Sequence, residues 1–133
     1  MVRRAVVVLA LAALTFGAVT VVALEGREVV VLETHDASGA ARRTRTWIAD
    51  DGDSLLVEAA TPERPFVQDL AHDPTLVLER AGERRECTAE VVPNPGGHVR
   101  IRRLLAERYG WADRWVALVA DTTRSIALRL TCA

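Results

Sequence analysis

The chain has 133 residues, with 17 basic and 18 acidic side chains and a hydrophobic share of 50%. This length fits a single domain, and the near-neutral charge argues against a protein that coats DNA or RNA, which would carry a basic surplus. Every basic residue is an arginine, which excludes lysine Schiff-base chemistry and a P-loop whose lysine binds phosphate.

The N-terminal segment is the most apolar part of the chain. Arg3 and Arg4 precede the uncharged run Ala5–Leu24, in which 17 of 20 residues are apolar. A helix of 20 residues spans about 30 Å, the thickness of the hydrocarbon core of a bilayer. The run exceeds the apolar region of about 7–15 residues that is usual in cleaved signal peptides. We therefore expect residues 1–24 to be a transmembrane signal anchor, with secretion after signal cleavage as the alternative.

The two arginines at the start predict the orientation of this anchor. Because positive residues stay on the cytoplasmic side, residues 25–133 are expected to form one domain outside the cytoplasm, attached to the cell membrane by a single pass. That compartment permits disulfides. Cys87 and Cys132 could pair if their strands are neighbours, and two unpaired thiols are an equally good interpretation.

The first half of the domain has the alternation and turn residues of short β-strands. Strands are expected over 29–32, 42–48 and 54–58, separated by turn clusters. Thr61 is a suitable N-cap before Pro62, which predicts a short helix from there to about His72.

The second half of the domain predicts a hairpin, two helices and a closing strand. The hairpin strands are expected at 75–80 and 84–92, and Pro93–Gly97 is expected to be a loop. Apolar residues at helical spacing follow from Ile101 to Tyr109; Gly110 then breaks the pattern. Helices are expected at 101–109 and 111–119, and the closing strand is expected at 124–130. This order indicates a mainly β fold with α-helices, a small barrel of about six antiparallel strands with helices packed outside.

The usual motifs of covalent and metal catalysis are missing from the sequence. His35, His72 and His98 are far apart and are expected to be solvated loop residues rather than metal ligands. No serine has the flanking glycines of a nucleophile elbow. The sequence therefore identifies no catalytic residue, and no metal site is expected.

Arginines concentrate on the strand expected at 42–48. Alternation places Arg43, Arg45 and Trp47 on one face of it. Guanidinium groups bind phosphate or carboxylate and an indole stacks on flat rings, so this face suits a planar anionic ligand. A solvated edge strand, protected from aggregation by its arginines, is an equally good interpretation.

A second set of arginines lies on the polar side of the helix whose apolar residues run from Ile101 to Tyr109, and it is interpreted as a solvated helix face. The set comprises Arg100, Arg102, Arg103 and Arg108. The aromatic residues at the break between the two expected helices are Tyr109, Trp111 and Trp115. Core packing is the commoner role for such residues, but they would also be the walls of a site for a flat cofactor.

Several short motifs, taken together, resemble those of the deazaflavin-dependent nitroreductase family, whose members have the split β-barrel of pyridoxamine 5'-phosphate oxidase-like flavin proteins. The matching segments are Leu32-Glu33-Thr34 before Ser38-Gly39, Arg42-Arg43-Thr44, Asp51-Gly52-Asp53, residues 70–77, Tyr109-Gly110-Trp111 and residues 125–130. They cover nearly the whole domain. The resemblance implies an FMN-binding-like split β-barrel over residues 25–133.

The same resemblance implies a function. It points to a membrane-anchored flavin- or deazaflavin-dependent oxidoreductase, similar to nitroreductases and quinone reductases, that acts on a quinone or a nitro compound. A deazaflavin or FMN would be bound by Ser38, Gly39, Arg42, Arg43, Thr44, Arg45, Trp47, Tyr109 and Trp111.

One segment departs from the family pattern. Where the family has a basic Arg-Lys-Ser-Gly turn, this chain has Asp36-Ala37-Ser38-Gly39, and the charge of Asp36 would oppose a phosphate. This departure favours an alternative function, a non-catalytic exported binding module for a lipid, a quinone or a protein partner. Since members of this fold class commonly dimerise, a homodimer is a further expectation.

Overall fold

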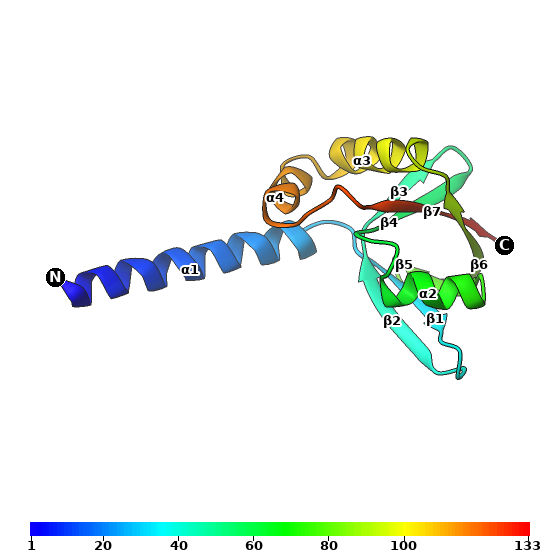
Figure 1. Cartoon of the computed structure of the whole chain (residues 1–133), viewed down its shortest axis with the longest axis horizontal. Coiled ribbons are helices and arrows are strands. Elements are labelled where there is room, and N and C mark those ends of the chain that lie inside the picture. Colours follow the sequence, from blue (N-terminus) through cyan, green and yellow to red (C-terminus); the bar gives the residue numbers. More distant parts are fainter.

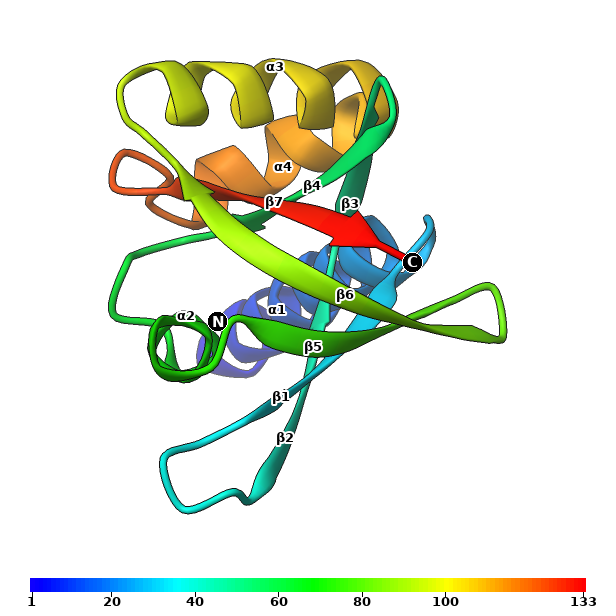
Figure 2. The same cartoon turned by 90° about the vertical axis from the view of Figure 1, so that its right-hand side faces the viewer.

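The computed structural model describes all 133 residues. Its elements, in chain order, are α1 (Val2–Glu25), β1 (Val30–His35), β2 (Ala41–Thr46), β3 (Ile48–Asp51), β4 (Ser54–Ala59), α2 (Pro65–His72), β5 (Thr75–Arg80), β6 (Glu83–Val92), α3 (Gly96–Tyr109), α4 (Trp111–Val119) and β7 (Ile126–Cys132). All seven strands form one antiparallel sheet in the order β2-β1-β5-β6-β7-β4-β3. Helix α1 projects from the sheet as a long rod (Figure 1), and the sheet curls into a half-barrel (Figure 2).

The two edges of this sheet come from one continuous stretch of chain. A single strand was expected over 42–48, and this is wrong at Trp47. There the strand divides into β2, which pairs with β1, and β3, which pairs with β4. The Trp47 indole turns away to stack on the Tyr109 ring, with centroids 4.3 Å apart and planes 7° from parallel. The barrel is therefore open between β2 and β3, and it has seven strands rather than six.

The core consists of two apolar clusters, one on each face of the sheet. The larger lies inside the half-barrel, where β-strand side chains meet Phe66 and Leu70 of α2. The smaller lies outside, where α3 covers β3, β4 and β7 and where Ala112 of α4 and Ala23 of α1 join the cluster. Successive residues of β4 serve both, because Leu56 belongs to the outer cluster and Val57 to the inner one.

Two helices begin elsewhere than expected. Helix α2 starts at Pro65, not after Thr61, because a residue that precedes proline avoids the helical conformation. Arg64 accordingly has φ −55° and ψ 137°. Helix α3 starts at Gly96, inside the expected loop. The close approach of the chain there requires Gly97, since a Cβ at this position would lie 2.4 Å from the carbonyl oxygen of Val92.

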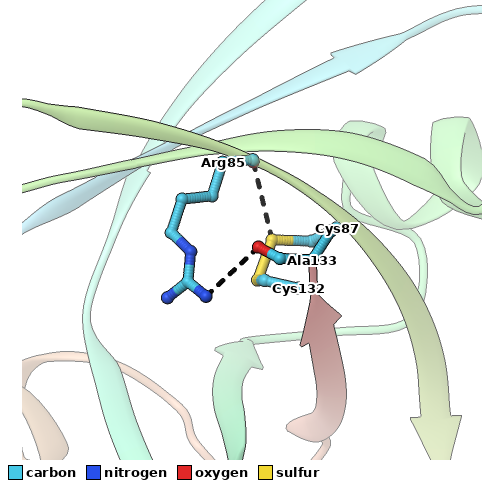
Figure 3. The surroundings of a disulfide bond; sticks show 4 residues. All are labelled: Arg85, Cys87, Cys132 and Ala133. Carbon is cyan, nitrogen blue, oxygen red and sulfur yellow. Dashed lines mark hydrogen bonds between the residues drawn. A yellow bond between two sulfur atoms is a disulfide. The ribbon is translucent and has the colours of Figure 1, made fainter.

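The two cysteines form a disulfide, which decides between the two interpretations of the sequence. Cys87 of β6 and Cys132 of β7 lie directly opposite each other in the strand register. Beside the bond, the guanidinium of Arg85 donates to the carbonyl oxygen of Ala133 at 3.2 Å (Figure 3). The disulfide thereby joins the C-terminal end of β7 covalently to β6, the central strand of the sheet.

Helix α1 is long and apolar enough to cross a membrane, so it could serve as an anchor or as a signal sequence. Contacts with the domain are confined to its C-terminal part. Ala23 is fully buried there, and Nε1 of Trp47 donates to the carbonyl oxygen of Leu24 at 3.0 Å.

Candidate functional site

A cavity of about 710 Å³ lies beside β2, at the open edge of the barrel. Most of its wall comes from the end of α1, strand β2 with Trp47, the end of β4, the start of α2 and the segment that follows α4. Val29, Leu105 of α3 and Val116 of α4 complete it. Its lining includes Leu24, Glu25, Arg42, Arg43, Thr44, Arg45, Trp47, Arg64 and Phe66. The volume is within the range of about 300–1,000 Å³ that is usual for small-molecule sites.

Strand β2 presents an unpaired edge to this cavity. On one side it is hydrogen-bonded to β1, and on the other side it has no neighbouring strand. Half of its backbone N–H and C=O groups are therefore free to bind a ligand. Such an edge offers a row of backbone donors and acceptors to a bound molecule.

The arginines of β2 form ion pairs with carboxylates on neighbouring elements. Nε of Arg42 lies 2.8 Å from Oδ2 of Asp69 on α2. The same oxygen accepts a hydrogen bond of 2.8 Å from the buried hydroxyl of Thr34. Arg42 is thus held toward the inner side of the strand, where Asp69 joins α2 to β2 through Arg42 and to β1 through Thr34.

The other two arginines of β2 lie on its outer side, as the alternation predicts. Arg43 contacts Glu33 at 3.1 Å and Glu79 at 2.9 Å, and its hydrogen bond to Glu79 holds the pKa of that carboxyl below the ordinary value. Arg45 forms an ion pair with Glu25 at the end of α1. These charges are balanced within the protein, which leaves little net attraction for an anion.

Arg64 differs from the three arginines of β2. It lines the cavity and is exposed, and it forms no ion pair. It is also the N-cap of α2, so its charge adds to the positive end of the helix dipole. Sequence reasoning missed this residue because it is 19 positions beyond Arg45 and only the folded sheet brings the two together.

The expected aromatic walls are separated by the structure. Trp47 lines the cavity, while Tyr109 is stacked behind it and is only 1% exposed. The Tyr109 hydroxyl accepts from the N–H of Ile48 at 3.2 Å and donates to the carbonyl oxygen of Glu28 at 2.8 Å. Trp111 is exposed on α4, outside the cavity lining. Of the aromatic residues expected at the site, Trp47 alone is among those that line the cavity.

The turn at Ser38 and Gly39 lies at the tip of the β1–β2 hairpin, away from the cavity lining (Figure 2). The Asp36 carboxylate accepts hydrogen bonds from the Ser38 N–H at 2.8 Å, the Ser38 hydroxyl at 2.6 Å and the Ala40 N–H at 3.0 Å. These bonds, above all that from the hydroxyl, lower the pKa of Asp36 and keep it ionised. Donors that a phosphate would use are thus occupied within the turn.

The solvated face expected for the arginines of α3 is wrong for Arg102. Its side chain is 17% exposed, and the guanidinium bridges Glu58 of β4, at 3.0 Å, and Asp113 of α4, at 2.7 Å. Arg100 and Arg108 likewise form ion pairs with Asp residues of β3. His98 is also not a solvated loop residue, since its Nδ1 lies 2.8 Å from the hydroxyl of the buried Ser125. Helix periodicity could not show these partners, because they belong to other elements.

No protein-family model and no curated protein matches the sequence. Solved structures match the fold of most of the chain. The fold is a split β-barrel. It is shared with a candidate pyridoxamine 5'-phosphate oxidase from Listeria innocua, at a TM-score of 0.57 and 13% identity over 84% of this chain and 89% of that one.

Two further structures have the same fold. An F420 reductase matches with a TM-score of 0.54 and 16% identity, over 80% of this chain and 86% of its own. A candidate 5-nitroimidazole antibiotic resistance protein from Bacteroides thetaiotaomicron matches with a TM-score of 0.58 and 9% identity, over 78% and 72%. Identities this low establish the fold alone. The expected fold class is therefore confirmed, and membership of the deazaflavin-dependent nitroreductase family stays a prediction.

Proposed function

We propose that this chain is a membrane-anchored oxidoreductase that holds FMN or a deazaflavin in the cavity beside β2. The observation that carries the proposal is the cavity itself, about 710 Å³ at the open edge of the barrel, with an unpaired strand edge and an unpaired arginine in its walls. The fold is shared with an F420 reductase and with a candidate pyridoxamine 5'-phosphate oxidase, which supports a cofactor of this type.

The residues of the cavity suit the parts of such a cofactor. The free backbone groups of β2 would pair with the polar rim of the ring system, and the Trp47 indole and the Phe66 ring supply apolar surface. Arg64, at the N-terminus of α2, would bind the phosphate. Among the residues expected from the sequence, Arg42, Arg43, Thr44, Arg45 and Trp47 line the cavity, so in this proposal the phosphate lies near Arg64 rather than at Ser38 and Gly39.

A bound flavin or deazaflavin would supply hydride transfer to a quinone or a nitro compound. The protein would bind and orient the two molecules and limit the access of water to them. Leu24 and Glu25, at the end of α1, belong to the cavity wall. A lipid-soluble substrate such as a quinone would therefore reach the cavity directly from the membrane surface.

A second function is favoured by the charges around β2. Because Asp36 occupies the donors of the hairpin turn and Arg42, Arg43 and Arg45 are ion-paired, the chain would suit a non-catalytic module that binds a lipid, a quinone or a partner protein. A homodimer formed through the barrel face is compatible with either function.

Cofactor titration of the full-length chain in detergent micelles tests the proposal. We expect FMN or a deazaflavin to bind saturably, as followed by its fluorescence anisotropy. The substitution Arg64→Ala should weaken this binding about tenfold, because it removes a charge-assisted hydrogen bond to phosphate. Arg103→Ala is the matched control, since Arg103 lies exposed on α3 with only a long contact of 3.9 Å to Glu107.

The same samples discriminate between the two functions. The proposal also predicts that added reduced cofactor is oxidised when a soluble quinone is supplied, faster than without the protein. Quinone binding without any binding of either cofactor would contradict the oxidoreductase and support the second function.

A further inference from the structure

Helix α4 carries apolar side chains on its exposed side. Trp111, Leu118 and Val119 are exposed, Leu118 to 82%, and Trp115 between them is half-buried. At about 100° per residue, Trp111, Trp115 and Leu118 project within about 60° of one another. Together with Val119, they form what is called the α4 stripe below.

Other residues of α4 attach the helix to the rest of the domain, and one exposed cation lies beside the α4 stripe. Ala112 is buried, and Asp113 is bound to Arg102. Arg114 is exposed and follows the stripe around the helix. Tryptophan and aliphatic residues next to an exposed arginine are typical of a helix that lies in the interfacial layer of a membrane.

The α4 stripe is continuous with the apolar surface of α1. The rings of Phe16 and Trp115 are 5.4 Å apart between centroids, and Nε1 of Trp115 donates to the Thr20 hydroxyl at 3.1 Å. Figure 1 shows α4 against the C-terminal part of α1. The long N-terminal part of α1 has no such neighbour.

The residues of α1 that contact α4 indicate how deep α4 would lie in a bilayer spanned by α1. Phe16 and Thr20 precede Leu24, the last residue of the apolar run, by about 12 and 6 Å along the helix axis. If the apolar run Ala5–Leu24 spans the hydrocarbon core and Leu24 marks its outer boundary, Trp115 lies on the hydrocarbon side of that boundary. Interfacial helices bury their apolar face about 5–10 Å deep, which is the depth that these contacts give to α4.

We propose that the α4 stripe is buried in the outer interfacial layer of the lipid bilayer that α1 spans. This inference depends on the anchor that is part of the proposed function. The barrel then touches the membrane at two places, α1 and α4. The cavity borders the ends of both helices, because its wall includes Leu24 and Glu25 at the end of α1 and Ala120 directly after α4. The open edge of the barrel is therefore held at the lipid surface.

Site-specific labelling of the full-length chain in vesicles tests this position. Both natural cysteines are in the disulfide, so Leu118→Cys introduces one free thiol, at a side chain that contributes little to the fold because it is exposed. The label is a fluorophore, and the vesicles contain phosphatidylcholine and phosphatidylglycerol with or without a spin label on the acyl chain. We expect the spin-labelled lipid to quench this fluorophore about threefold more than one at Val99→Cys, an exposed position at the far end of α3.

Labelling at Val8→Cys, on the exposed surface of α1, separates the anchor from the stripe. Strong lipid quenching at positions 8 and 118, with iodide quenching only at position 99, supports the proposal. Quenching by lipid at position 8 but by iodide at position 118 would overturn the proposal and leave the anchor standing. If neither quencher reached position 118, a second copy of the chain would cover the stripe, and the proposal would be wrong. Iodide quenching at position 8 would contradict the anchor itself.

Discussion

Arg102→Ala should lower the free energy of unfolding by about 3–5 kcal/mol, the usual cost of removing one partner from a buried ion pair. The guanidinium lies between Glu58 and Asp113, and all three side chains are largely buried. Its removal leaves two carboxylates facing each other without a compensating charge. Because Asp113 belongs to α4 and Glu58 to β4, the loss also weakens the attachment of both helices to the sheet.

Urea denaturation of the full-length chain, followed by tryptophan fluorescence, measures this effect. Arg103→Ala, one position along the same helix but exposed, should change the free energy by less than about 0.5 kcal/mol. The double variant Arg102→Ala/Asp113→Ala should be less destabilised than the sum of the two single variants, since the first substitution already breaks the contact. A loss below about 1 kcal/mol for Arg102→Ala would contradict the assignment of this triad as a buried ionic contact.

Replacing both cysteines by alanine should destabilise the domain by about 2–4 kcal/mol. The disulfide closes a loop of chain between positions separated by 45 residues, and the entropy that it removes from the unfolded state accounts for most of the effect in this model. The loop spans α3, α4 and the return into β7, so the unfolded variant gains freedom over a third of the chain.

Denaturation midpoints with and without a thiol reductant provide the measurement. The natural chain should lose stability in reductant, while Cys87→Ala/Cys132→Ala should be equally stable in both conditions. Equal midpoints for the natural chain, with reduction verified by thiol alkylation, would show that the cross-link has no stabilising effect.

Local signals in the sequence were sufficient for much of the fold. The β5–β6 hairpin follows from its turn at Ala81 and Gly82, both of which have positive φ. Gly110, which also has positive φ, ends α3 where the periodicity breaks. The split barrel itself was expected from the family resemblance, because short motifs in the right order reflect a shared topology even when identity is low.

Features that depend on residues far apart in the sequence could not be predicted. The strand break at Trp47 depends on the Tyr109 ring, 62 positions later, and alternation alone continues through that point. Arg102 has the spacing of a solvated residue on α3, yet its partners come from β4 and α4. The cavity could not be predicted either. The residues next to Arg64, its exposed arginine without an ion pair, do not distinguish it from the other arginines of the chain.

The absorption spectrum of the full-length protein, extracted with mild detergent from the membranes of the cells that produce it, tests the central claim most directly. A cofactor in the cavity beside β2 predicts a visible flavin or deazaflavin band that co-elutes with the natural chain and with Arg103→Ala and is diminished in Arg64→Ala. A natural chain that elutes with aromatic absorption alone, and that takes up neither FMN nor a deazaflavin when these are added, would contradict it.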